Sequence, residues 1–170
     1  MATAVTTSSH AIAATAIVRE HAALAMVASM VPVPFAEFAA VSAVHLRMIE
    51  DLSREYGVDF RPQRARALVT ALLSGYASYS LDSFLVGSLA KFIPGLGSAV
   101  ALITLPSITA ALTYALGRIF IGHFERGGSL IDFDSARLQQ GFLHEVERSR
   151  VHPAEFARII GARAAATPRP

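Results

Sequence analysis

The sequence predicts an all-α protein: a four-helix, two-hairpin hydrophobic bundle followed by a small C-terminal helical pair. Apolar residues make up 53% of the 170 residues and charged residues only 16%, against about 45–50% and about 25% in typical soluble domains. Apolar positions recur at helical spacing, and no stretch of useful length alternates like a strand. Prolines and glycines divide the chain into pieces of helix length. Such a composition favours a membrane-associated protein or an obligate oligomer.

The first predicted helix covers residues 11–30, an Ala-rich stretch with one Arg-Glu pair near its middle. The sequence VPVP at 31–34 ends it, because proline lacks an amide donor and disfavours helix in the residue before it. The ends of the chain, residues 1–9 and 166–170, are predicted to be disordered tails.

The second predicted helix covers residues 35–56 and has one apolar and one charged side. Gly57 is suited to cap its C-terminus, and Glu50 precedes Arg54 in the favourable order for an ion pair. The apolar side carries Phe38, Val41, His45, Met48, Ile49, Leu52 and Tyr56. The charged side carries Arg47, Glu50, Asp51 and Arg54.

The third and fourth predicted helices form the apolar middle of the chain. The third covers residues 61–90, is rich in serine and glycine, and contains Asp82. KFIPGLG then forms a turn. The fourth covers residues 98–124, with Pro106 as an expected kink. Small residues on the third helix favour close approach of another helix, as in helix association within lipid.

These helices make up a predicted hydrophobic domain at 11–128, followed by a C-terminal amphipathic arm at 131–165. The first arm helix begins near Asp134 or Ser135, both suitable N-caps. The second begins at Pro153, since proline suits the first helical position.

The uncharged stretch at 92–117 poses the main functional question, because a helix of that length could cross the roughly 30 Å hydrocarbon core of a bilayer. A hairpin with Lys91 at its tip would gather arginines on one side, as the positive-inside rule requires for cytoplasmic ends. These arginines are Arg61, Arg64, Arg66, Arg118 and Arg126. The prolines at 94 and 106 fit a shallow re-entrant or interfacial hairpin as well.

Two alternatives stay open. The apolar helices could instead form the centre of a soluble helical oligomer that acts as an adaptor, with the 131–165 arm as its contact surface. A third class is conduction of an ion or small solute along Asp82 and the neighbouring serines.

Because no basic stripe is interleaved with aromatic residues, nucleic acid is not an expected partner.

No enzymatic motif is complete, and neither a cofactor nor a metal is expected. PGLGSAV lacks the third glycine and the preceding strand of a dinucleotide loop, and no P-loop occurs. HEVER lacks the second histidine of an HExxH zinc site. The amides that open the fourth helix, with a nearby lysine, could contact an anion such as a lipid phosphate, but a plain glycine turn with a lysine at the water boundary is the favoured explanation. This candidate site consists of Lys91, Gly95, Gly97 and Ser98.

Two polar residues in apolar surroundings need partners. Asp82 must be hydrogen-bonded, paired or protonated, whether it lies in lipid or in a protein core. His45 falls on the apolar stripe of its helix, where a lone histidine is ordinarily a hydrogen-bonded core residue.

Several stretches resemble a known family. PVPFAEFAAVSAVHLRMIEDLSREYGVDF resembles the pattern P-[IV]-P-x-[AG]-[DE], then Met-Ile, then L-x-x-x-Y-G; KFIPGLG and TYALGR…F…GG follow at suitable distances. In this order they resemble the bacterial domain-of-unknown-function family 697, a GTPase-associated, YcjF-like membrane domain. The matching positions are Pro32, Pro34, Glu37, Met48, Tyr56, Gly57, Lys91, Pro94, Gly95, Gly97, Thr113, Tyr114 and Gly117.

The resemblance implies a helical membrane module that works with a GTPase in trans, since this chain carries no GTPase of its own. It implies a location in the bacterial inner (cytoplasmic) membrane, and the arginine asymmetry described above predicts cytoplasmic ends. His45 stands where the family pattern often has glutamine. We therefore expect a non-enzymatic, membrane-associated helical protein that self-associates as a homo-oligomer.

Overall fold

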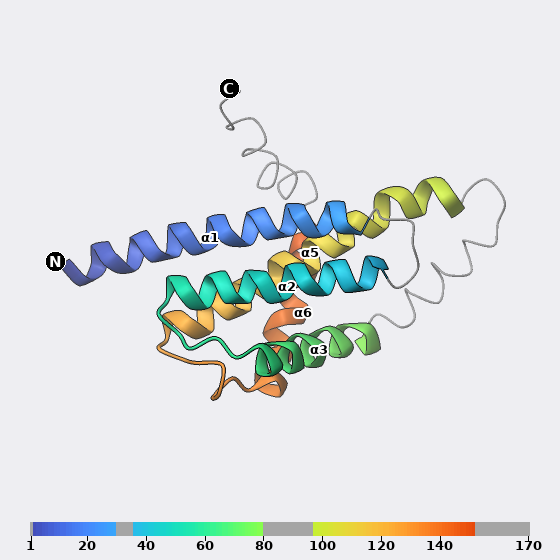
Figure 1. Cartoon of the computed structure of the whole chain (residues 1–170). Helices are drawn as coiled ribbons and strands as arrows, with labels where there is room; N and C mark the ends of the chain where they lie inside the picture. The colour runs from blue at the N-terminus through green and yellow to red at the C-terminus, as the bar shows by residue number, and fades with distance from the viewer. Residues whose placement is uncertain (1, 30–35, 80–96, 152–170) are drawn as a thin grey trace, which may run out of the picture.

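The computed structural model describes residues 2–29, 36–79 and 97–151, which form five α-helices and no strand (Figure 1). Within these ranges the all-α prediction is confirmed. The helices are α1 (Ala2–Ala28), α2 (Ala36–Glu55), α3 (Pro62–Tyr79), α5 (Gly97–Glu125) and α6 (Ser135–Val151). The predicted second arm helix, from Pro153, lies outside the described residues.

Four of the helices lie along a common direction, and α6 runs across them (Figure 1). Helix α1 is antiparallel to α2, and α3 is antiparallel to both α2 and α5. The C-terminal ends of α1 and α3 therefore share one end of the bundle with the N-terminal ends of α2 and α5.

The pairing of the helices differs from two side-by-side hairpins. Helix α1 packs extensively on α2, as a hairpin would, but its largest contact is with α5. Helix α3 touches α5 only marginally and packs mainly on α6. The backbone of α5 can approach α1 closely because Gly117 has no side chain: a Cβ there would lie 2.4 Å from a methyl group of Val18.

The core is one cluster of buried side chains contributed by all five helices and by the loop before α6. The predicted apolar stripe of α2 is confirmed at four positions, His45, Met48, Ile49 and Leu52, which are all buried. The largest fully buried side chains elsewhere include Val18, Leu72, Leu116, Phe120, Leu130, Phe142 and Val146.

The ends of α2 and α6 follow the predicted signals. Gly57 follows α2 with φ +66°, a conformation that glycine adopts without a steric penalty, and its N–H donates to the Arg54 carbonyl at 3.3 Å. The Asp134 carboxylate accepts the Arg137 N–H at 3.1 Å, which makes Asp134 the N-cap of α6.

The N-terminus differs from its prediction. Helix α1 begins at Ala2, so it includes residues 2–9, which the sequence suggested as a disordered tail. Once a helix is nucleated and packed, each further residue adds a hydrogen bond at little cost, and the Ser and Thr residues lower the propensity only slightly.

Candidate functional site

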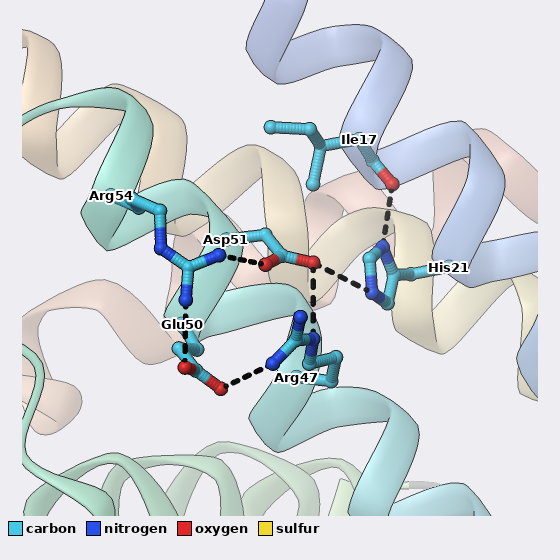
Figure 2. A network of polar contacts seen from close by, with 6 residues as sticks. All are labelled: Ile17, His21, Arg47, Glu50, Asp51 and Arg54. Atoms are coloured by element: carbon cyan, nitrogen blue, oxygen red, sulfur yellow. Dashed lines mark hydrogen bonds and ion pairs between the residues drawn. The ribbon is translucent and has the colours of Figure 1, made fainter.

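A network of charged side chains joins α1 to α2 (Figure 2). Asp51 is its centre: its carboxylate lies 3.1 Å from Arg54 Nη1, 3.5 Å from Arg47 Nε and 3.5 Å from His21 Nε2. Glu50 pairs with the same two arginines, and its 2.9 Å contact with Arg54 is the ion pair that the sequence predicts. His21 reaches this network from the opposite helix.

His21 is buried, and its ring is oriented by its own helix. Nδ1 donates to the Ile17 carbonyl at 2.9 Å, which directs Nε2 toward Asp51. Pairing between His21 and Asp51 was not predicted from the sequence, because the two residues belong to different helices and no local pattern connects them.

A second polar contact lies deeper, between α2 and α5. His45 is 2% exposed, and its Nε2 lies 2.9 Å from Thr113 Oγ1. The Thr113 hydroxyl donates its own hydrogen to the Thr109 carbonyl at 2.8 Å. Thr113 Oγ1 therefore accepts a hydrogen bond from His45 Nε2–H. Burial, together with the nearby His21, lowers the pKa of His45 to about 4. The imidazole is therefore neutral at neutral pH.

A third set of polar contacts joins the C-terminal end of α2 to α1 and to the C-terminal end of α5. His10 Nδ1 lies 2.7 Å from Glu55 Oε1, which joins α1 to the end of α2. The Tyr56 hydroxyl donates to Glu125 at the end of α5, at 3.3 Å. Burial and the neighbouring Glu125 raise the pKa of Tyr56 to about 12.

The histidines mark a boundary along the bundle. On one side lie the charged parts of α2 and α5 and the start of α3, which together form what we call the charged end; it includes all five arginines that the sequence suggested would gather on one side. On the other side lie residues 22–28, 39–44, 67–79 and 97–112, which contain no charged residue. We call these four segments, which meet at the other end of the bundle, the uncharged end (Figure 1). Glu37, in the first turn of α2, also lies there, and α6, which carries charged residues, packs on the 67–79 segment.

Part of the uncharged end is open to its surroundings. On α1, the side chains of Leu24 and Val27 are 50% and 65% exposed. The stretch His10–Ala28 is long and apolar enough to cross a membrane, and 28% of it is buried in the protein. Among the helices that the structure describes, it is the one that meets both conditions.

Two of the residues predicted to contact an anion lie in the described part of the chain. Gly97 and Ser98 form the first turn of α5. Lys91, Gly95 and Asp82 lie outside the described residues, so the anion contact and the partners of Asp82 stay predictions. Among the residues that the structure describes, no group of three His, Asp or Glu side chains is arranged to hold a metal ion.

Comparison with known proteins places the chain in a family. The family model described as Domain of unknown function (DUF697) matches residues 2–148. Magnetosome membrane protein 22 of Magnetospirillum gryphiswaldense is 34% identical over 138 residues, which cover 81% of this chain and 71% of that protein. No solved structure matches the chain. The family match covers nearly all of the five described helices. The protein therefore belongs to the DUF697 family.

Proposed function

We propose that the protein is a non-enzymatic, membrane-associated helical module that enters a phospholipid membrane by its uncharged end. The observation that carries this proposal is the segregation of charge along the bundle. Four segments from separate parts of the sequence bring uncharged residues to the same end, while the arginines of α2, α5 and the start of α3 lie at the other. Exposed apolar surface marks an interaction site, and an end of the bundle whose helices α1, α3 and α5 are free of charge there suits contact with lipid.

The lengths of the uncharged segments support entry without crossing. From residue 97 to residue 112, α5 rises about 24 Å, and residues 22–28 of α1 rise about 10 Å, against a hydrocarbon core of about 30 Å. Arg19 and Glu20 follow directly on the charged side of the boundary. An arginine at the bilayer centre costs about 2.5–3.5 kcal/mol, which favours keeping α1 at this depth over a full crossing.

The chemistry of the charged end fits the phospholipid surface. Its exposed arginines can remain in water near anionic headgroups, where each basic residue contributes about 1 kcal/mol of attraction. The relative named Magnetosome membrane protein 22 supports a membrane location for this chain too. The bacterial inner membrane, with cytoplasmic ends, is the location that we propose.

The test compares exposed apolar side chains at the two ends. We expect the double substitution Leu24→Glu and Val27→Glu to lower binding to phosphatidylcholine–phosphatidylglycerol vesicles by at least about tenfold, because it removes apolar area from lipid and adds two charges there. Flotation of vesicles on a density gradient measures the bound fraction.

Ile131 provides the matched control, because it is 60% exposed but lies at the charged end, beside Arg64. Ile131→Glu should leave binding unchanged. Equal binding by all three proteins, or a wild-type protein that stays monodisperse without detergent and ignores vesicles, would contradict the proposal and favour the soluble adaptor.

The proposal includes self-association in the membrane. The outward side of α3 carries small residues at helical spacing, which suit close contact with the same helix of a second copy. The exposed members are Ala67, Thr70, Ala71, Ser74, Ala77 and Ser78. Ala71→Leu should shift the protein to a smaller species in detergent sizing, whereas Ala136→Leu, an equally exposed alanine on α6, should not.

We also propose that the module works with a GTPase in trans and that Lys91, Gly95, Gly97 and Ser98 contact a lipid phosphate. The GTPase partnership is supported by the family resemblance, and the phosphate contact by the tendency of helix N-termini to bind anions. The double substitution Arg137→Glu and Arg148→Glu, at exposed positions of the arm, should abolish co-purification of a GTPase partner from cells that produce both proteins. Unchanged recovery would show that this arm is not the contact.

A further inference from the structure

Helix α6 holds α3 in the bundle. Helix α3 makes its largest contact with α6, a smaller one with α2 and only a marginal one with α5. Helix α6 in turn packs extensively on α5, and it runs across the direction of the other helices (Figure 1). The position of α3 beside α5 therefore depends on α6.

The contact between α6 and α3 falls within the uncharged segment of α3. The Gln139 side chain lies against Gly75, where a Cβ would be 2.3 Å from Gln139 Cδ, and its amide donates to the Leu72 carbonyl at 3.1 Å. Phe142 and Val146 of α6 are fully buried in the same cluster as Leu72.

The side of α6 that faces away from the core is exposed and polar. Its exposed polar and charged residues are Arg137, Gln140, His144, Glu147 and Arg148. Charged side chains oppose entry into hydrocarbon strongly. While α6 crosses α3 near Leu72 and Gly75, that part of the uncharged end cannot be surrounded by lipid.

The base of α6 is anchored independently of its contact with α3's uncharged segment. Phe133 is buried and its ring stacks on Phe120 at 4.6 Å. Arg64 donates to the carbonyls of Leu130 and Ile131, at 3.1 Å each. Beyond this base, α6 is held by buried side chains, Phe142 and Val146 among them, and by the contact of Gln139 with α3. The base would stay in place if α6 moved off α3.

We propose that α6 is a releasable strap: it moves off α3 about its anchored base when the uncharged end meets phospholipid, and the face that it covers on α3 then contacts lipid. This rests on the proposed membrane function and adds the conformational step that controls the depth of entry. In water the strap covers apolar surface; in the membrane, lipid replaces it.

A reversible disulfide tests the strap, because the chain contains no cysteine of its own. The double substitution Gly75→Cys and Gln139→Cys places cysteines at two positions in direct contact, since a Cβ at 75 would lie 2.3 Å from the former Gln139 Cδ. The full chain is mixed with phosphatidylcholine–phosphatidylglycerol vesicles, oxidised or reduced, and washed with carbonate. We expect the carbonate-resistant fraction to be at least about tenfold lower in the oxidised protein, since the closed strap keeps charges over α3.

The single substitution Gly75→Cys is the matched control, since it carries the same new side chain but cannot close the disulfide. Its carbonate-resistant fraction should not depend on oxidation. Equal resistance of the oxidised and reduced strap variant would overturn the strap and leave the membrane function standing. Absence of vesicle binding in both forms, and in the wild type, would overturn both.

Loosening the strap gives a second measurement that needs no disulfide. Gln139→Ala removes the contacts with Leu72 and Gly75, whereas the neighbouring Gln140 is exposed. Gln139→Ala should embed faster in vesicles than the wild type, and Gln140→Ala at the wild-type rate. Equal rates for the two variants would contradict a strap held by Gln139.

Discussion

Leucine in place of Gly117 is expected to destabilise the protein by at least about 3 kcal/mol, near the upper limit for overpacking a core. Gly117 is buried at the largest helix contact, and a Cβ there would lie 2.4 Å and 2.6 Å from the two methyl groups of Val18. Since both helices run past this point with their backbones close together, the leucine must push α1 off α5. Thermal unfolding followed by circular dichroism in mild detergent measures the loss.

Alanine at two positions of the same helix separates this steric effect from helix propensity. At Gly122 a Cβ would meet only Arg126, at 3.5 Å, so Gly122→Ala should stabilise α5 by about 0.5–1 kcal/mol. Gly117→Ala should destabilise the protein, and Val18→Ala should restore part of its stability by making room. If Gly117→Ala and Gly122→Ala stabilise the protein equally, α1 and α5 do not pack closely at Gly117.

Acid is expected to destabilise the protein through His45. Its pKa is about 4 in the folded state and near the ordinary histidine value of 6.5 when unfolded. As the pH falls below about 6.5, His45 becomes protonated in the unfolded chain but stays neutral in the folded protein. The free energy of unfolding therefore decreases until the pH reaches about 4, where the folded protein binds the proton too. A gap of this size corresponds to about 3 kcal/mol. Above pH 6.5 this contribution is fully present.

Replacing His45 with glutamine isolates its share of the acid response. The glutamine amide can still donate to Thr113 but takes up no proton in this range. The difference in unfolding free energy between pH 7 and pH 4 should shrink by about 3 kcal/mol in His45→Gln. His144→Gln, at an exposed position of α6, should retain the wild-type difference. An unchanged pH response in His45→Gln would show that the imidazole is not buried in its neutral form.

Features set by neighbouring residues could be predicted from the sequence. The two sides of α2, its glycine cap and the Glu50–Arg54 pair depend on spacings of three or four residues, and each is present in the structure. The cap of α6 at Asp134 is equally local. The family could be predicted because three short motifs occur in the expected order, and the family model confirms it.

The choice of helix partners could not be predicted. The two apolar helices on either side of KFIPGLG suggested a packed hairpin, but α5 packs mainly on α1. That choice depends on the fit between Gly117 and Val18, which are far apart in the sequence. The contacts of His21 with Asp51 and of His45 with Thr113 follow from the same long-range pairing, which no local pattern encodes.

The central claim is that one end of the bundle contacts lipid while the other stays in water. Because the chain has no cysteine, single cysteines at Val27 and Ile131, which are 65% and 60% exposed, can carry an environment-sensitive fluorophore in vesicle-bound protein. The account predicts a blue-shifted emission, quenched by lipid-attached quenchers, at position 27 and a water-like emission at position 131. A water-like emission at both positions would contradict it.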